Sequence, residues 1–185
     1  MVKLVQKNNV LYILTYKNLF KYEDSKFSFI ANIDDIFYNP EDINNRREFR
    51  SCCFDKVNDV IYLASSNGLI IYNINEGTFT VEDRTLNGII RNVAYDVKRD
   101  KYYYQYNAEG VFDSDGNHIC DVAAINDLYI VDDTLYIGAT GVIQYDLVNR
   151  KTSDSQFDFI EDQVNVIYYS ESINMIVVGC DNDTT

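Results

Sequence analysis

The stretch Val60-Ile-Tyr-Leu-Ala-Ser-Ser-Asn-Gly-Leu-Ile-Ile-Tyr-Asn73 decides the fold of this chain. Residues 60–64 and 69–72 are β-branched, aromatic or aliphatic, and residues 65–68 between them have the composition of a tight turn. A second turn leads to a further strand at 78–81. Strands this apolar cannot leave one face in water. The stretch therefore predicts a β-hairpin that packs against copies of itself.

Four other copies of the pattern occur along the chain. In each copy an apolar strand, a turn and a second strand follow one another, and the aligned positions are Tyr12, Tyr62, Tyr103, Tyr136 and Val177. The intervals are roughly 30–50 residues, which is the period of the blades of a β-propeller. Every copy after the first is preceded by one more short strand, at 50–55, 91–96, 125–129 and 164–168. The predicted repeating unit is therefore four antiparallel strands.

The predicted fold is an all-β β-propeller of about four and a half four-stranded blades in a single domain. The blades are expected at about 1–30, 49–83, 90–122, 125–160 and, in part, 163–185, with an insertion at 31–48. The outer strand of the fourth blade is expected at 155–160. Because a half blade has an unpaired edge, we expect one of two arrangements. In the first, which is the preferred interpretation, the propeller continues past Thr185. In the second, a four-bladed ring closes and the extra strands dock elsewhere.

Charge and hydropathy limit the partners and the compartment. The chain has 185 residues and a formal net charge of −13, so neither nucleic acid nor an anionic membrane is expected as a partner. Its N-terminal segment lacks the apolar core of a signal peptide, and no run reaches the length of a membrane span. If Met1 is the natural start, these features predict a cytoplasmic protein or a component of a viral particle. If the chain is a piece of a sensor, an extracytoplasmic place is expected.

Residues that often carry chemistry are few. Cys52, Cys53, Cys120 and Cys180 fit no zinc-binding spacing, and we interpret all four as small core residues, as is typical of a reducing compartment. His118 is the only histidine. A general base needs an orienting partner and a nucleophile, and the sequence indicates neither for it. The sequence therefore predicts a protein that is not an enzyme and has no cofactor or metal site.

Two copies carry a resemblance to a known family. Residues 61–73, Ile-Tyr-Leu-Ala-Ser-Ser-Asn-Gly-Leu-Ile-Ile-Tyr-Asn, and 135–146, Leu-Tyr-Ile-Gly-Ala-Thr-Gly-Val-Ile-Gln-Tyr-Asp, resemble the two-component-regulator propeller repeat. The Trp typical of its second position is Tyr62 or Tyr136 here, and the Trp-Asp and paired-glycine signatures of WD40 and kelch repeats are absent. The resemblance implies an extracytoplasmic sensor of small molecules or glycan fragments. The same blade pattern also occurs in intracellular and viral scaffold proteins.

Polar residues stand at the start of the predicted innermost strands, namely Arg50 and Ser51, Arg91 and Asn92, Asn126, and Asn165. In a propeller such positions gather at one mouth of the central channel. Two arginines there would hold the carboxylate or phosphate of a small anionic ligand by paired hydrogen bonds. The alternative is that the arginines pair with neighbouring acidic side chains.

The insertion supplies a second candidate surface. It contains Asp34, Asp35, Arg46 and Arg47, and residues 42–49, which lie in it and just past it, are the best candidate for a helix. Long connections often carry function, so we expect an interaction loop; the alternative is a surface loop without function. We interpret the chain as a non-enzymatic propeller that serves as a protein-interaction scaffold in a larger assembly. The alternative is a sensory module that binds a small anionic or sugar ligand at the channel mouth.

Overall fold

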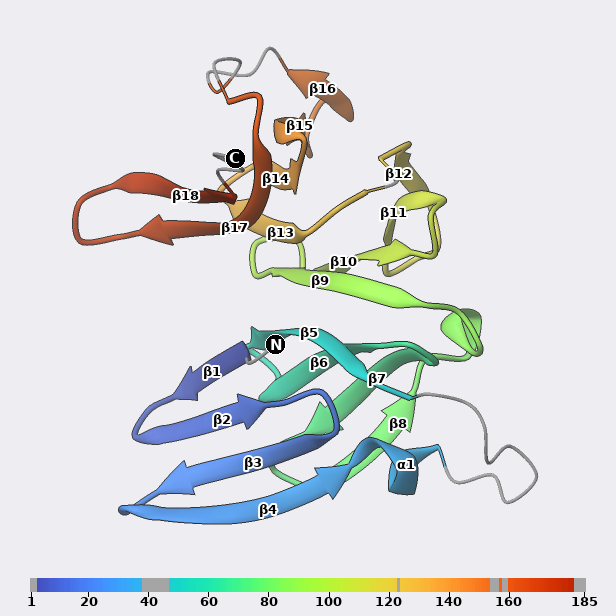
Figure 1. Ribbon diagram of the computed structural model, residues 1–185, viewed down its shortest axis with the longest axis vertical. Helices are drawn as coiled ribbons and strands as arrows, with labels where there is room; N and C mark the ends of the chain where they lie inside the picture. The colour runs from blue at the N-terminus through green and yellow to red at the C-terminus, as the bar shows by residue number, and fades with distance from the viewer. Residues whose placement is uncertain (1–2, 38–46, 123, 154–156, 158–159, 182–185) are drawn as a thin grey trace.

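The computed structural model describes residues 3–37, 47–122, 124–153, 157 and 160–181 (Figure 1). Apart from the one-turn helix α1 (Ile33–Ile36) and the 3-10 turn η1 (Asp83–Thr85), the regular structure is all β. The strands are β1 (Lys3–Lys7), β2 (Val10–Leu14), β3 (Asn18–Glu23), β4 (Lys26–Asn32), β5 (Phe49–Asp55), β6 (Val60–Ser65), β7 (Gly68–Asn73), β8 (Thr78–Val81), β9 (Ile90–Asp96), β10 (Lys101–Tyr106), β11 (Gly110–Asp113), β12 (His118–Cys120), β13 (Asp127–Val131), β14 (Thr134–Ala139), β15 (Gly141–Asp146), β16 (Lys151–Ser153), β17 (Gln163–Ser170) and β18 (Met175–Asp181).

The strands form five antiparallel sheets in chain order. The first sheet is β1–β4, the second β5–β8, the third β9–β12 and the fourth β13–β16, each with its strands side by side in the order of the sequence. The fifth sheet consists of β17 and β18 among the described residues. The predicted all-β class and the four-stranded unit are confirmed. β1 gives the first copy an innermost strand that the sequence pattern did not predict separately.

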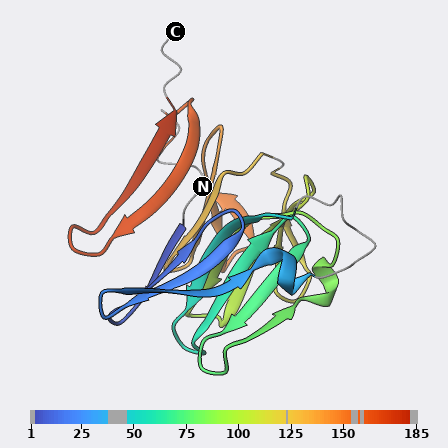
Figure 2. The ribbon, with the colours of Figure 1, turned by 60° about the horizontal axis from the view of Figure 1, so that its bottom comes forward.

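The five sheets radiate from a common centre, as two views of the ribbon show (Figures 1 and 2). The first strand of every sheet is innermost, because residues of β1, β5, β9, β13 and β17 together line one central cavity. This is the arrangement of propeller blades around their axis.

Strand register agrees with the predicted alignment of the copies. In every sheet the aligned residue of the second strand lies opposite the same position of the first strand, in the pairs Tyr12–Val5, Tyr62–Cys53, Tyr103–Ala94, Tyr136–Tyr129 and Val177–Tyr168. Tyr103, and not its neighbour, is therefore the equivalent residue in the third sheet.

Apolar side chains fill the space between consecutive sheets. Tyr12 and Leu19 of the first sheet pack with Ile61, Leu63 and Ile70 of the second sheet, and all five are at most 4% exposed. Similar clusters lie between the second and third, the third and fourth, and the fourth and fifth sheets. The apolar strands thus have both faces covered, as their composition predicts.

A repeated turn connects strands within the sheets. The Asp55 carboxylate at the end of β5 accepts hydrogen bonds from the backbone N–H groups of Val57 (2.9 Å) and Asn58 (3.0 Å), and Asp146 at the end of β15 does the same two and three residues on. The residue before the next strand has a positive φ, 57° at Asp59. Such Asx turns explain why Asp and Asn recur at strand ends.

Several local predictions were wrong. The outer strand of the fourth sheet is β16 and not 155–160, because it pairs with β15 directly after the turn. The insertion contains α1, capped by the Asn32 side chain; most of the helix candidate at 42–49 lies outside the described residues, so it stays a prediction. Cys180 is exposed and is not a core residue. No helix in the described part of the chain is long and apolar enough to cross a membrane.

Candidate functional site

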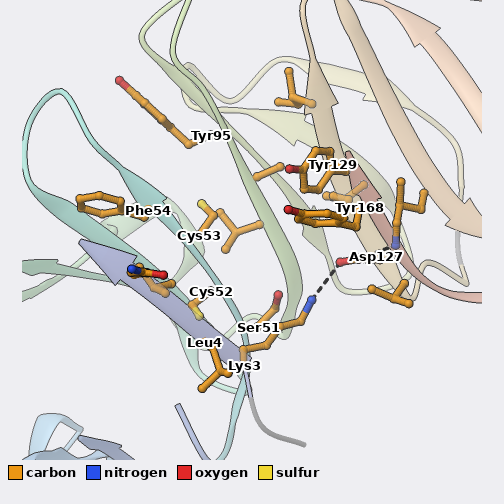
Figure 3. Close-up of a pocket in the computed structure, with 18 residues that line it drawn as sticks. Lys3, Leu4, Ser51, Cys52, Cys53, Phe54, Tyr95, Asp127, Tyr129 and Tyr168 are labelled. Atoms are coloured by element: carbon orange, nitrogen blue, oxygen red, sulfur yellow. Dashed lines mark hydrogen bonds and ion pairs between the residues drawn. The ribbon is translucent and has the colours of Figure 1, made fainter. Parts of the chain in front are cut away.

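The candidate site is the central cavity, which has a volume of about 510 Å³ (Figure 3). Four residues lie at the same level of their innermost strands, namely Lys3, Ser51, Asp127 and Val166. Each pairs with the residue of the second strand that comes two positions after the aligned residue of its copy, that is, with residue 14, 64, 138 or 179. Asn92 belongs to the same level of β9, where its side chain bonds to Gln105. Of the four residues at this level that line the cavity, Lys3, Ser51 and Asp127 are polar and Val166 is apolar.

An ion pair spans the cavity between residues 124 positions apart. The Lys3 ammonium group donates to an Asp127 carboxylate oxygen at 3.1 Å, and the backbone N–H of Ile167 donates to the other oxygen at 2.9 Å (Figure 3). Asp127 is 5% exposed. Its charge is thus compensated within the chain, as a buried carboxylate requires. The pair ties the first, fourth and fifth sheets together across the axis.

Aromatic rings and thiols make up much of the rest of the lining. Tyr129 and Tyr168 meet edge to face with ring centroids 6.3 Å apart, and burial raises the pKa of Tyr129. Burial also raises the pKa of Cys52 to about 12 and that of Cys53 well above its ordinary value. Both thiols therefore stay protonated near neutral pH and supply no thiolate nucleophile. The lining suits a neutral polar molecule that stacks on tyrosine.

The predicted arginines do not line this cavity. Arg50 pairs with Glu48, with 3.3 Å between the nitrogen and the oxygen, while Arg91 is exposed on β9. For Arg50 the structure thus has the local ion pair that the sequence left as the alternative. No contact between either arginine and a ligand is established, so their role in binding stays a prediction.

The other polar residues predicted at the channel mouth have surroundings that differ from one another. Ser51 is buried and lines the cavity. The buried Asn92 amide donates to the Ile125 carbonyl oxygen at 3.0 Å and so links the third sheet to the connection that follows it. Asn126 lies with Asn165, because its amide donates to the Val164 carbonyl oxygen (2.9 Å) and to the Asn165 side-chain oxygen (3.3 Å). These contacts clamp neighbouring sheets together.

The candidate interaction loop is only partly described. The Asp34 carboxylate accepts from the Lys17 ammonium group at 3.0 Å, and Asp35 is exposed in α1. Arg47 is buried, and Arg46 lies outside the described residues. The described residues of the insertion thus include both an exposed acidic pair and a buried cation.

Sequence reasoning missed Lys3, Asp127 and the tyrosine pair. A signal existed for Asp127, since it is the one charged residue of β13, where it precedes four apolar residues and directly follows Asn126. Lys3 gave no signal, because β1 was not predicted as a strand of its own. Among the described residues no group of three or more His, Cys, Asp or Glu side chains is placed to hold a metal ion.

Comparisons with known proteins rest on structure alone. No family model matches the sequence, and no curated protein matches it. Among solved structures, the chain is similar to the extracellular domain of a protein from B. thetaiotaomicron assigned as a hybrid two component system, with a TM-score of 0.69, 15% identity, and coverage of 97% of this chain and 25% of that one. It is also similar to Saccharomyces cerevisiae Sqt1 (TM-score 0.67, 12% identity, 97% and 56%) and to a chain of the mitotic checkpoint complex (TM-score 0.68, 10% identity, 96% and 56%).

The sheets, the axis and these likenesses define a β-propeller protein. At identities of 10–15% the likenesses show the fold alone. The chain spans a quarter of the length of the first of these structures and about half the length of the other two.

Proposed function

We propose that this propeller is a non-enzymatic protein-interaction scaffold, and that one face of the first sheet is a binding surface. This outer face is the one that points away from the second sheet. The observation that carries the proposal is the exposure of that face. Leu4 is 60% exposed, Phe27 70% and Phe29 59%. Neighbours with the same fold include a chain of a multiprotein complex and a sensor domain, which supports an interaction or sensory role.

The register shows what this face corresponds to. Two cross-strand rows form it, Leu4–Ile13–Phe20–Phe29 and Gln6–Leu11–Tyr22–Phe27. The equivalent rows of the second sheet are Cys52–Leu63–Ile70–Val81 and Phe54–Ile61–Tyr72–Phe79. The second sheet buries its rows against the first sheet, and there Leu63 and Ile70 have no exposed surface.

The chemistry of the face indicates its partner. None of its eight side chains is charged, and Phe20 and Phe29 form an edge-to-face pair with ring centroids 5.9 Å apart. An apolar surface of this kind is rare on a monomer without function. The partner that fits is a protein that presents a flat, apolar β-sheet face. Covering a large apolar side chain contributes about 1.5–3 kcal/mol.

A photo-crosslinking amino acid at Phe29 tests the proposal. We expect it to capture one protein in stoichiometric amount, and we expect the purified partner to bind at least tenfold more weakly to Phe29→Glu. The matched control is position 148, because Val148 is equally exposed but lies in the turn after β15. Equal capture at both positions would contradict the proposal.

A second function is supported by the cavity. A sensory role would use the tyrosine rings and the Lys3–Asp127 pair of the cavity to hold a small sugar, whereas an organic acid would bind at the predicted arginine site. A thermal-shift screen with such compounds tests it, since a ligand that binds the folded state raises the melting temperature. Stabilisation that is lost in Tyr168→Ala, and unchanged in Arg91→Ala, would place the ligand in the cavity; loss in Arg91→Ala or Arg50→Ala would place it at the predicted arginine site.

A further inference from the structure

A second cavity lies between the third and fourth sheets. It has a volume of about 280 Å³, and none of the described residues that line it also lines the central cavity. Its lining comes from β10, β11 and β12, from β15, and from the turns before β10 and after β15. Lys101, which lines it, pairs with Asp96 at the end of β9, whereas Arg91 stands near the start of that strand. The cavity therefore lies at the other end of the sheet from the predicted arginine site.

Two tyrosines of this cavity have equivalents between the first and second sheets. Tyr103 is the aligned residue of its copy and corresponds to Tyr12, and Tyr145 occupies in β15 the register position that Tyr72 occupies in β7. Tyr12 and Tyr72 pack edge to face with ring centroids 6.5 Å apart. Tyr103 and Tyr145 both line the cavity. The repeat therefore forms a ring contact at this place between the first two sheets and a cavity between the third and the fourth.

The hydroxyl groups of these two tyrosines are unused hydrogen-bond donors. Tyr103 is 4% exposed and Tyr145 is 6% exposed, yet neither hydroxyl has a hydrogen-bond partner in the described part of the chain. Burial raises the pKa of both tyrosines, against the positive charges of Arg99 and Lys101 at Tyr103 and of Arg150 at Tyr145. Each hydroxyl therefore lies near cationic side chains of the lining. Because buried polar groups are normally hydrogen-bonded, two unpartnered donors at one cavity point to a ligand that accepts hydrogen bonds.

The charges of the lining indicate which kind of acceptor fits. Arg99 and Lys101 each pair with two carboxylates of the chain. Arg150, in the turn after β15, also lines the cavity but pairs with no carboxylate of the described residues. The Asp113 carboxylate accepts from the Asn117 amide at 3.0 Å and pairs with Lys101 at 3.4 Å, so its charge is already compensated. The lining thus presents one uncompensated positive charge beside two free hydroxyl donors, which complements a singly charged anion.

We propose that this cavity binds a small organic monocarboxylate with an apolar body. The carboxylate oxygens accept from the Arg150 guanidinium group and from the hydroxyls of Tyr103 and Tyr145, and the apolar body contacts Leu147. The volume is at the low end for ligand cavities, so the ligand is small. A phosphate ester fits less well, because its second negative charge is repelled by the carboxylates that hold the other two cations. The inference is independent of the proposed scaffold, and the site is separate from both places considered for a sensory ligand.

A thermal-shift titration with sodium isovalerate tests the proposal on the intact chain. At constant ionic strength we expect isovalerate to raise the melting temperature and isovaleramide, which has the same shape without the charge, to leave it unchanged. Tyr145→Phe keeps the ring and removes the hydroxyl, while Arg150→Gln removes the charge, and each should weaken binding roughly tenfold or more. The matched controls are Tyr72→Phe, at the equivalent position, and Arg91→Gln, at an exposed arginine; both should bind like the wild type. Circular dichroism shows whether the variants are folded.

Modification of arginine by phenylglyoxal, read by mass spectrometry, locates the bound acid. Isovalerate should slow the modification of Arg150, which lines the cavity, and leave that of the exposed Arg91 unchanged. Equal protection of both arginines, or of neither, overturns the proposal.

Other results would overturn it as well. One is the absence of any rise in melting temperature with isovalerate up to about 50 mM, and another is an equal rise with isovaleramide. Stabilisation by inorganic phosphate without stabilisation by isovalerate overturns the assignment to a monocarboxylate. Binding that Tyr145→Phe and Arg150→Gln leave intact, but that is lost in Tyr168→Ala or in Arg91→Gln, places the acid in the central cavity or at the predicted arginine site instead. None of these results bears on capture at Phe29.

Discussion

Replacement of Asp127 by alanine probes the contact that joins three sheets across the axis. The carboxylate accepts from Lys3 at 3.1 Å and from the buried N–H of Ile167 at 2.9 Å. Alanine removes both acceptors and leaves the Ile167 N–H without its partner. Asparagine keeps an oxygen for that N–H and removes only the charge that faces Lys3. The two variants therefore separate the hydrogen bond from the ion pair.

The expected magnitudes follow from burial. A hydrogen bond to a charged group contributes about 1.5–3 kcal/mol, and the Lys3 ammonium group, whose side chain is 28% exposed, adds at most about 1 kcal/mol. Asp127→Ala should thus lower the free energy of unfolding by about 2–4 kcal/mol, and Asp127→Asn by about 1 kcal/mol. For a domain of this size, these losses correspond to roughly 6–12 °C and 3 °C in melting temperature.

Thermal and urea unfolding at pH 7, followed by circular dichroism, measures both losses. Asp121→Ala is the matched control, because the Asp121 side chain is 94% exposed and its change should stay within about 0.5 kcal/mol. If Asp127→Ala is no more destabilising than Asp121→Ala, the contact across the axis does not stabilise the fold and the reasoning is refuted.

Three further predictions concern other parts of the chain. Burial raises the pKa of Asp113, but hydrogen bonds from Asn117 outweigh burial and lower the pKa overall. The ionised carboxylate therefore stabilises the fold fully above pH 4, and this stabilisation is lost as the pH falls. The free energy of unfolding in urea should differ less between pH 7 and pH 3 in Asp113→Asn than in the wild type. Cys180 should react with a thiol reagent at pH 8 at least tenfold faster than Cys52 and Cys53, whose pKa burial raises, and equal rates by mass spectrometry would contradict the burial of the cavity lining. Gly110→Ala should lower the free energy of unfolding by about 2–4 kcal/mol, because φ at this residue is 120° and the new Cβ would meet the Cys120 carbonyl oxygen. Gly77→Asn should lower it by less than about 1 kcal/mol, since nothing lies within 4 Å of the Cβ position. Similar melting temperatures for the two variants would contradict this.

Most of the fold could be predicted because the apolar residues recur in the same order in each copy of the repeat. The copies that contain Tyr62 and Tyr136 have an aromatic residue at a fixed position between aliphatic ones, and the same position recurs as Tyr12 and Tyr103. A tyrosine there is buried or half-buried between sheets in all four cases, so burial explains the recurrence. β16 could not be predicted, since its three exposed residues carry no apolar pattern.

The candidate site was harder to predict, for two physical reasons. Which polar residue of an innermost strand points at the axis depends on register to a single residue, and Arg50 and Ser51 therefore have different surroundings. The pairing of Lys3 with Asp127 depends on how far the sheets turn around the axis between the first and the fourth. Sequence separation contains no information on that angle, so the contact could be found only in three dimensions.

The measurement that tests the radial arrangement most directly is zero-length carbodiimide crosslinking of the native chain, read by mass spectrometry. The arrangement predicts an amide between Lys3 and Asp127, which only sheets that surround a common axis bring together. The exposed Lys98–Asp133 ion pair, with 2.6 Å between nitrogen and oxygen, is the internal control. A Lys3–Asp127 link that disappears in Asp127→Asn supports the propeller; a Lys98–Asp133 link without any Lys3–Asp127 link contradicts it.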